Sequence, residues 1–554
     1  MNHHRSGDTA TLNTVFEAFQ AIARATPDAA CLAVPPRAGR SYLPDGLEES
    51  YGEVSMKVEA LKRAYADQGY GIGHRVALSL ENRPEIIYHW LALNGLGAAI
   101  VPVNPDYVRD DLKYLLTHSE ADLVVALPDR VASISAIARE IGDLPVIDSE
   151  ACLERLPAAR RAPATGRPGR DTEGAILYTS GTTGQPKGCR LCNDYFFFAG
   201  ERYLAAGGLM AVRPGQERLY NPLPLFYANS LGISNMAMIL SGGCMIFPDR
   251  FHPRSFWSDL IATKATIIHY LGLIPPVLLS LPEDPMEREH RVRFGVGAGV
   301  DPDQHRLFEQ RFGFPLIEVW GMSEVAICTA ENCEPRRMHG RSIGRPLPGI
   351  AIAILDDHDQ PVPAETPGEL AVRRDGPDPR AGFFKGYFKE DEETEHCWRN
   401  GWFHTGDIAL LDRDGRYIFV DRKKHMIRRS GQNIAAAEVE QVLLAHPAVA
   451  QVGVIPAPDG LREEEVLACV VLGPKAEPTE ATARDLVAFC LERIAYFKVP
   501  GWVAFFPSLP MTSTQKLQKT KILGPGQGAE TLKDCFDLRS LKSGARDRGR
   551  RANA

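Results

Sequence analysis

The sequence predicts an α/β protein with a smaller α+β unit near its C-terminal end, and three observations predict this fold class. Between residues 75 and 296, short apolar runs alternate with amphipathic segments, as in parallel sheets with helices packed on their faces. After residue 343 the apolar runs are shorter and are joined by Gly, Pro and Asp turns, as in a small antiparallel barrel or sheet. From residue 435 onward, two amphipathic segments and two apolar runs predict a compact α+β unit of about 105 residues.

Hydrophobic periodicity predicts the N-terminal elements. Val15, Phe16, Phe19, Ile22 and Ala23 lie on one face of a 3.6-residue period, which predicts a helix beginning near residue 12. Further helices are expected at 83–96, 110–117 and 130–141. Strands are expected at 75–80, 99–103, 121–127, 175–178, 244–247, 265–270 and 293–296.

The later elements predict where the domains divide. Strands are expected at 350–355, 368–372, 416–420, 450–455 and 466–472, and helices at 435–445 and 481–494. We therefore expect an N-terminal domain over 1–420, a boundary at 421–424 and a C-terminal domain over 425–525. The Arg- and Gly-rich end predicts a partly disordered tail within 526–554.

Composition excludes several classes of protein. The chain has 554 residues, 44% of them hydrophobic, and a net charge of −7, which argues against a nucleic-acid partner. The longest nearly apolar stretch, residues 90–103, is interrupted by Asn94 and is shorter than the ~20 residues of a membrane span. The first thirty residues contain no apolar run, so no secretory signal is expected and the protein is predicted to be cytoplasmic.

Eleven cysteines are scattered at irregular spacing, which is typical of reduced thiols. Cys189 and Cys192 form a CxxC, which is half of a redox or zinc motif. No second CxxC or His pair supplies the remaining ligands, so an incidental pair is favoured over a metal site.

The strongest local motif is ILYTSGTTGQPKG at residues 176–188, where an apolar strand runs into a loop rich in Gly, Ser and Thr. Glycines let backbone N–H groups approach an anion, hydroxyls donate to phosphate oxygens, and Lys187 supplies a cation. The spacing does not fit the GxxxxGK[ST] pattern, which disfavours a P-loop NTPase. A flexible turn is the ordinary alternative for a Gly/Ser/Thr cluster.

With this motif the sequence resembles the adenylate-forming enzymes, which include acyl- and aryl-CoA synthetases, peptide-synthetase adenylation domains and firefly-type luciferases. The resemblance runs from about residue 16 to residue 521 with the motifs in the family's order. Beyond the first motif, these are GVDP (299–302), VWGMSE (319–324), GEL (368–370), GWFHTGD (401–407), DRKKHMIRRSGQNI (421–434) and LPMTSTQK (509–516).

The resemblance implies the fold in more detail: a large N-terminal domain of doubly wound sheets, a small β-subdomain, and a mobile α+β C-terminal lid that turns about Lys424. It also implies ATP, Mg²⁺ and CoA as ligands, with Glu324 and Thr182 holding the metal. Lys516 would bridge the carboxylate and the α-phosphate during adenylation, and Lys187 would contact phosphate. Lys516 has an ordinary alternative as a solvated lysine, and Glu324 as a surface acid.

Further ATP contacts are implied for residues of the first loop and of the later motifs. Trp320 would stack on adenine, where the family more often has Tyr, and Asp407 would accept from the ribose hydroxyls with help from Arg422. The alternatives are a core Trp and a turn-forming Asp. Gly431 would face the pantetheine tunnel. The other implied nucleotide contacts are Thr179, Ser180, Gly181, Thr183, Gly184, Gly299, Gly321 and Ser323.

Two departures from the family pattern concern the chemistry. Gln515 replaces the usual Gly before Lys516, which changes the loop but removes no functional group. Tyr227 stands where most members have His, close to the carboxylate, and is either a hydrogen-bond donor there or a core tyrosine. Gly297 and Ala298 are expected to line the acyl site, with a tight strand end as the alternative for this glycine-rich run.

The resemblance therefore implies an acid–CoA ligase that forms acyl-AMP and pyrophosphate from Mg·ATP and then a CoA thioester. An enzyme that loads a carrier protein and a silent sensor of ATP or acyl-AMP are the alternatives. The segment after Tyr227 and the C-terminal motif look most like the carnitine/crotonobetaine-CoA ligase branch, with aryl and medium-chain acids left open. Small molecules are the expected partners, without nucleic acid or a membrane span, and a homodimer is among the expectations because dimers are common in the family.

Overall fold

The computed structural model describes residues 9–179, 186–338, 340–429, 432–459, 463–511, 517–524 and 527–542. The chain divides into two compact units. Unit 1 comprises Met1–Ala353, Ala371–His404 and Gly415–Tyr417, and unit 2 comprises Ile354–Leu370, Thr405–Asp414 and Ile418–Ala554. The boundary expected at 421–424 stays a prediction.

The first sheet of unit 1 has six strands in the order β6-β5-β3-β4-β7-β8. All neighbours are parallel except β7 and β8. The strands are β3 (Arg75–Ser79), β4 (Ala99–Pro102), β5 (Leu123–Ala126), β6 (Val146–Asp148), β7 (Glu173–Thr179) and β8 (Lys187–Cys192). Continuous burial of β4 and β5 explains their unbroken apolar sequences.

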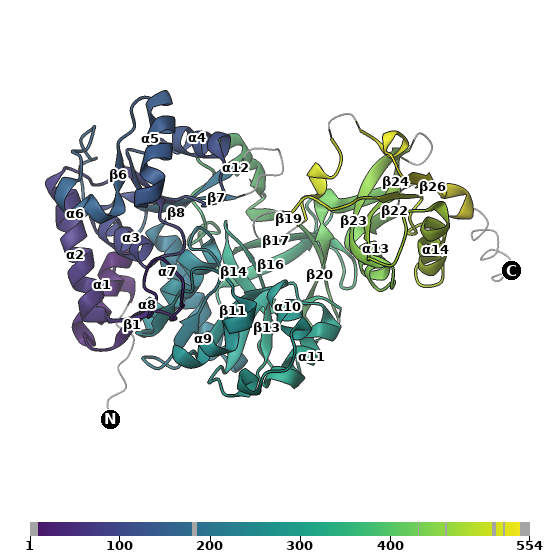
Figure 1. Cartoon of the computed structure of the whole chain (residues 1–554), viewed down its shortest axis with the longest axis horizontal. Coiled ribbons are helices and arrows are strands. Elements are labelled where there is room, and N and C mark those ends of the chain that lie inside the picture. The colour runs from purple at the N-terminus through teal and green to yellow at the C-terminus, as the bar shows by residue number, and fades with distance from the viewer. Residues whose placement is uncertain are drawn as a thin grey trace. The chain divides into compact units, whose positions relative to one another are not determined.

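Helices cover this sheet, and Figure 1 shows α1 (Val15–Ala25), α2 (Tyr51–Asp67) and α3 (Glu85–Leu96) grouped together and α4 (Arg109–His118) beside α5 (Val131–Glu140). Leu112 and Leu115 of α4 and Ile134 of α5 pack with strand residues such as Val124 in one core. These helices and strands confirm the predicted elements to within about two residues at most ends. The α/β fold class is therefore confirmed.

The second sheet of unit 1 runs in the order β2-β1-β10-β9-β11-β12-β13-β14-β15. Its strands are β1 (Ala30–Val34), β2 (Leu47–Ser50), β9 (Arg218–Tyr220), β10 (Cys244–Ile246), β11 (Ile267–Leu271), β12 (Phe294–Ala298), β13 (Leu316–Met322), β14 (Ala326–Ala330) and β15 (Ser342–Pro346). Neighbouring strands are parallel within the run β1-β10-β9-β11-β12-β13. The sheet ends in antiparallel pairs on both sides, β1 with β2 and β13 with β14 followed by β15.

Helices α9 (Phe256–Ala262), α10 (Ile274–Ser280) and α11 (Pro302–Phe312) lie together near β11 and β13 (Figure 1). Their residues Phe256, Ile274 and Phe308 pack with Tyr270 and Leu316 in a second core. Helices α7 (Asn193–Ala205) and α8 (Asn235–Ser241) also belong to this unit and are buried along most of their length.

The small β-subdomain has β16 (Ile350–Leu355), β17 (Gly368–Arg374), β19 (Trp402–Leu411) and β20 (Tyr417–Arg422) in the spatial order β16-β17-β19-β20. Between β17 and β19 the chain forms α12 (Asp391–Cys397) and the two-residue strand β18 (Trp398–Arg399), which pairs with β19.

The part of unit 2 that follows β20 is the predicted α+β body. Its sheet runs β22-β21-β24-β25-β26 with β23 paired to β24. Its elements are β21 (Met426–Arg429), β22 (Gln432–Ala435), α13 (Ala436–Leu444), β23 (Val449–Asp459), β24 (Glu463–Leu472), α14 (Glu480–Leu491), β25 (Trp502–Phe505) and β26 (Cys535–Asp537). Both helices pack on the sheet through a core that includes Val439, Leu443, Leu486 and Val487.

Part of the segment expected to be a tail belongs to this body. Strand β26 pairs with β25, and the Lys542 ammonium lies buried 2.5 Å from Glu465 Oε1. The same carboxylate accepts from Arg429 Nε at 2.8 Å, so one buried acid holds two cations. Residues 543–554 lie outside the described part of the chain.

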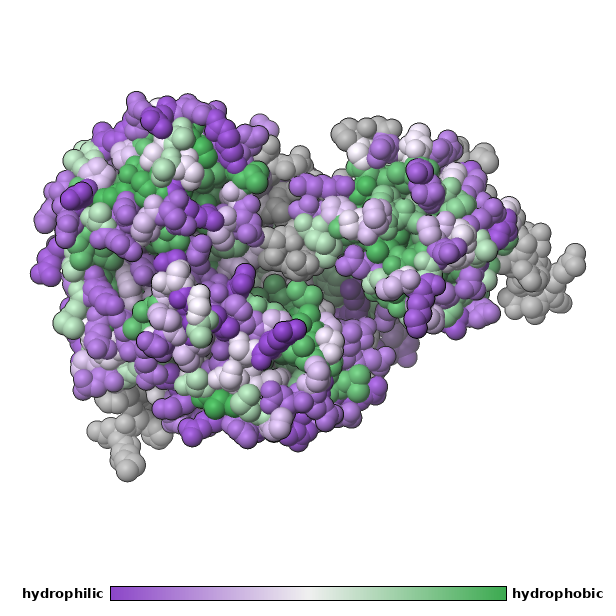
Figure 2. Space-filling model, in the orientation of Figure 1, coloured by the Kyte–Doolittle hydropathy of each residue, from purple (hydrophilic) through white to green (hydrophobic). Residues whose placement is uncertain are grey.

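The surface is of mixed character. Hydrophilic side chains cover most of the face shown in Figure 2, with hydrophobic patches between them. Among the described residues, none of the helices combines the length and apolarity needed to cross a bilayer.

Candidate active site

Seven of the predicted site residues lie outside the described residues: Ser180, Gly181, Thr182, Thr183, Gly184, Gly431 and Lys516. The two strands that flank the first loop are described, and Thr179 at the end of β7 pairs with Lys187 at the start of β8. The loop is therefore the connection of an antiparallel hairpin. Lys424 lies in a short 3₁₀ turn, Lys423–His425, and its side chain is not among those described.

Lys187 is held on the first residue of a strand, and its side chain is 8% exposed. Its ammonium lies 2.5 Å from Glu393 Oε1 of α12 and 5.1 Å from the centre of the Tyr387 ring. A carboxylate and an aromatic face both favour a cation at this point. The ion pair fixes the direction of the ammonium.

Glu324 follows β13 in a tight turn and is 5% exposed. Its Oε1 accepts a hydrogen bond of 2.8 Å from the Tyr387 hydroxyl. Burial and the Glu324 charge raise the pKa of Tyr387, so the tyrosine is a neutral donor. Burial raises the pKa of the Cys189 thiol as well, and Glu324 adds to that shift.

Tyr387 brings Lys187 and Glu324 together, and none of the sequence motifs contains it. Backbone hydrogen bonds fix its segment on both sides: Phe384 N donates to Glu324 O at 2.8 Å, and Phe388 N donates to Gly188 O at 2.8 Å. No spacing rule connects this tyrosine to either partner. Its surroundings, GFFKGYF at 382–388, give only an aromatic cluster as a signal.

Residues before Glu324 lie on β13. Trp320 is buried and pairs in register with Thr329 of β14. A Cβ at Gly321 would lie 2.1 Å from the Ala326 carbonyl oxygen, so only glycine fits there. Ser323 is half-buried in the turn. The turn that carries Glu324 therefore depends on close approach of the two strands.

Gly297, which is predicted to line the acyl site, is closely packed on β12. A Cβ at Gly297 would lie 2.3 Å from the carbonyl oxygen of Tyr270 and 2.5 Å from its ring, so Tyr270 already fills that space. Ala298 is half-buried, and Gly299 has a φ of +86°. The Gly299 N–H donates to Glu318 Oε2 at 2.9 Å.

The segment around Tyr227 carries a buried polar network. Tyr227 lies with its ring 4.6 Å from Phe226, and a π-helical turn at Asn229–Ser234 follows it. Asn229 Oδ1 lies 2.8 Å from Nδ1 of His269, whose Nε2 lies 3.1 Å from the Tyr203 hydroxyl. Burial lowers the pKa of His269 to about 3, so the imidazole is neutral. π-helical turns are frequent at functional sites.

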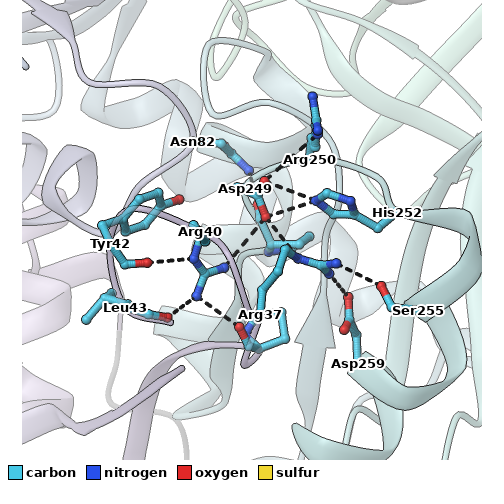
Figure 3. A network of polar contacts seen from close by, with 12 residues as sticks. Arg37, Arg40, Tyr42, Leu43, Asn82, Asp249, Arg250, His252, Ser255 and Asp259 are labelled. Carbon is cyan, nitrogen blue, oxygen red and sulfur yellow. Dashed lines mark hydrogen bonds and ion pairs between the residues drawn. The ribbon is translucent and has the colours of Figure 1, made fainter. Parts of the chain in front are cut away.

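A second polar network lies beside the segment that leads to Tyr227 (Figure 3). Asn82 accepts from Leu225 N at 2.9 Å and donates to the Pro248 carbonyl at 2.7 Å. Next to it Asp249 lies 3.0 Å from His252 and 3.4 Å from Arg37. These contacts tie the loop after β1 to the end of β10.

In unit 2, Asp407 is 1% exposed, and its Oδ1 lies 2.7 Å from Arg422 Nε. The Asp407 N–H donates to the Thr405 hydroxyl, which itself donates to the Leu370 carbonyl at 2.6 Å. The two residues predicted to contact the ribose, Asp407 and Arg422, therefore lie in contact. The hydrogen bond from the Asp407 N–H to Thr405 fixes the backbone that carries the carboxylate.

The chemistry of these side chains fits Mg·ATP. Among the described residues, no three His, Cys, Asp or Glu side chains gather to hold a metal ion. Mg²⁺ is usually held by one or two carboxylates together with substrate phosphates and water. Glu324, a buried carboxylate close to the buried cation Lys187 through Tyr387, is the hard oxygen donor that such a site needs. Cys189 and Cys192 are free, buried thiols.

Comparison with known proteins agrees with this chemistry. The model of the AMP-binding enzyme family matches residues 19–388, and the model of the AMP-binding enzyme C-terminal domain matches residues 438–516. Sulfoacetate–CoA ligase of Cupriavidus necator is 32% identical over 491 residues, covering 86% of this chain and 92% of that protein. Crotonobetaine/carnitine–CoA ligase of Salmonella paratyphi A is 28% identical over 488 residues, covering 85% and 92%.

Solved structures share the fold. ATP-bound MatB from Rhodopseudomonas palustris has a TM-score of 0.77 at 25% identity and covers 92% of this chain and 98% of its own. The o-succinylbenzoate CoA synthetase of Bacillus subtilis, in complex with its acyl-adenylate, has a TM-score of 0.78 at 24% identity.

Proposed function

The chain belongs to the AMP-binding enzyme family and is an AMP-forming acid–CoA ligase, and we propose that Lys187, Glu324 and Tyr387 form its phosphate-binding surface. The observation that carries the proposal is the contact of one tyrosine with both a buried carboxylate and a buried ammonium. Glu324 would hold Mg²⁺, which offsets the negative charge of the phosphates when it is bound. Thr182 would add a hydroxyl ligand, and Lys187 would contact phosphate.

In the first step a carboxylate oxygen of the acid attacks the α-phosphorus of ATP. A new O–P bond forms, the bond to the bridging oxygen breaks, and pyrophosphate leaves. The repulsion between two anions is the main obstacle, and Lys516 would offset it by bridging carboxylate and α-phosphate. Asp407 would accept hydrogen bonds from the ribose hydroxyls, with Arg422 holding the carboxylate at 2.7 Å.

In the second step the sulfur of CoA attacks the acyl carbon. A C–S bond forms, the C–O bond to AMP breaks, and the thiol proton passes to water. We propose that the C-terminal lid turns about Lys424 between the two steps, removing Lys516 and presenting the Gly431 loop to the pantetheine arm.

We further infer a short acid that carries a second polar group. The relatives are named for sulfoacetate and for crotonobetaine or carnitine, which are small and charged. The segment after Tyr227 is polar, and Ser230 Oγ and the Asn235 amide are buried without a hydrogen-bond partner among the described residues. Such groups cost about 1–3 kcal/mol each when left unpaired. A polar substrate end would supply the missing partners.

The test is pyrophosphate release from Mg·ATP over a panel of short acids and matched plain fatty acids, with and without CoA. Turnover that consumes CoA with a polar short acid supports the proposal. Pyrophosphate without CoA consumption would instead indicate carrier loading.

In a Lys516→Ala variant, adenylation is expected to fail while thioester formation from supplied acyl-AMP persists. Equal loss of both half-reactions would contradict the role of Lys516.

A further inference from the structure

A buried arginine lies close to Glu324 but outside the proposed chemistry. Arg202 of α7 is 2% exposed, and among the described residues it forms no ion pair. Its N–H groups bind backbone carbonyls instead: Nη2 donates to the Val325 carbonyl at 2.7 Å, and Nε donates to the Phe198 carbonyl at 3.3 Å. Nη1 lies 3.7 Å from Cys328 Sγ.

Such a placement is costly. Transfer of a cation from water to the protein interior costs several kcal/mol, and a carboxylate partner would normally offset part of it. Burial lowers the pKa of Arg202, which reflects this cost. Replacing even a buried ion pair by well-packed apolar side chains is often neutral or stabilising, and among the described residues Arg202 has no carboxylate partner. Stability of the core therefore does not explain this guanidinium.

Arg202 contacts two chain segments that adjoin Glu324. Val325, whose carbonyl it binds, is the residue after Glu324. Its guanidinium lies 4.1 Å over the Phe198 ring and 5.7 Å from the Phe383 ring. Phe383 precedes Phe384, whose N–H donates to the Glu324 carbonyl. One side chain thus contacts the turn of Glu324 and the segment that leads to Tyr387.

We propose that Arg202 is a positioning residue that fixes the backbone of the Glu324 turn, and through it the direction of the carboxylate, for Mg·ATP. The proposal rests on the proposed function of Glu324. The planar fork of arginine suits this task because its nitrogens reach two carbonyls and a sulfur at once. Lysine has the charge but not the fork.

The experiment compares Arg202→Lys and Arg202→Met with wild type by measuring the ATP dissociation constant with and without Mg²⁺. Loss of a group that orients a metal ligand typically costs about 10- to 100-fold in metal affinity or activity. We expect both variants to lose about tenfold in Mg·ATP affinity while metal-free ATP binding changes less than about twofold. Arg202→Lys keeps a long cationic side chain, so it tests the idea if Arg202→Met does not fold.

Arg374 provides the matched control. It lies 4.4 Å over the same Phe198 ring, but within the described part of the chain no hydrogen bond connects it to the Glu324 turn. Arg374→Met is expected to bind Mg·ATP like wild type. Equal losses with and without Mg²⁺, or full affinity in Arg202→Lys, would overturn the proposal. If wild type itself binds ATP without any Mg²⁺ dependence, the assignment of Glu324 fails instead.

Discussion

The hydroxyl of Tyr387 donates a 2.8 Å hydrogen bond to Glu324 Oε1, and the Lys187 ammonium lies 5.1 Å from its ring centre. Hydrogen bonds to charged groups contribute about 1.5–3 kcal/mol, which corresponds to roughly 10- to 100-fold. Tyr387→Phe keeps the ring and removes this bond. We expect kcat/KM for pyrophosphate release to fall by that factor and the Mg²⁺ concentration for half-maximal rate to rise.

Tyr417→Phe is the control for this change, because its hydroxyl donates to the Ile352 carbonyl and forms no hydrogen bond with the described site residues. Its Mg²⁺ dependence should match wild type. A Tyr387→Phe enzyme with unaltered Mg²⁺ dependence would remove Tyr387 from the site.

We expect Glu393 to compete with phosphate for Lys187. The two side chains lie 2.5 Å apart, and Glu393 is 37% exposed, so the pair is worth at most about 1 kcal/mol. Glu393→Gln leaves the ammonium without its carboxylate, and we expect ATP to bind up to about fivefold more tightly in equilibrium dialysis. Glu395→Gln on the same helix, which breaks an exposed pair with Arg380, should leave ATP affinity unchanged. Weaker binding by Glu393→Gln would show that Glu393 helps Lys187 instead.

Asp407 gives a prediction specific to the sugar. Asp407→Ala removes the proposed acceptor of the ribose hydroxyls, so ATP should bind about 10- to 100-fold more weakly. Binding of 2′,3′-dideoxy-ATP, which lacks those hydroxyls, should hardly change. Asp356→Asn serves as the control because, among the described residues, that side chain accepts from N–H groups of its own turn and from no site residue. A similar loss for both nucleotides would assign Asp407 to structure alone.

We expect the free energy of unfolding to fall in acid because of His269. Burial lowers its folded pKa to about 3, whereas an unfolded His titrates near ~6.5. Between these values only the unfolded chain takes up the proton, so the stabilisation is present above pH ~6.5 and is lost as pH falls, by about 1.4 kcal/mol per unit.

His269→Gln cannot take up this proton, so it should be less stable than wild type at pH 7.5 and the difference in Tm should shrink towards pH 5. His358→Gln, on an exposed turn, is the matched control with a constant difference. A His269→Gln deficit that stays the same at both pH values would mean that the imidazole is not buried in its neutral form.

Most elements of the fold were predictable because periodicity is a local property. The helix at Val15–Ala25 and the strands at Arg75–Ser79 and Leu123–Ala126 follow from residues that are close in sequence. Lys187 was predicted as a cation near phosphate, but its place on an antiparallel strand depends on pairing with β7, which the motif does not encode.

The supporting residues of the site were not predictable in the same way. Tyr387, Glu393 and Arg202 meet the predicted residues only through the tertiary fold, and their sequence neighbourhoods resemble ordinary aromatic or charged segments. The place of Gly297 at the acyl site stays a prediction. The sequence did not indicate that a Cβ at this position would lie 2.5 Å from the ring of Tyr270 on the neighbouring strand.

The buried contact of Lys542 with Glu465 bears on where the folding unit ends. The C-terminal family model stops at residue 516, and the recognisable motifs stop with it. A chain trimmed to those limits would lose strand β26 and one of two cations on a carboxylate enclosed by the core. The range matched by the family model is therefore shorter than the stretch of polypeptide needed to make the C-terminal α+β body intact.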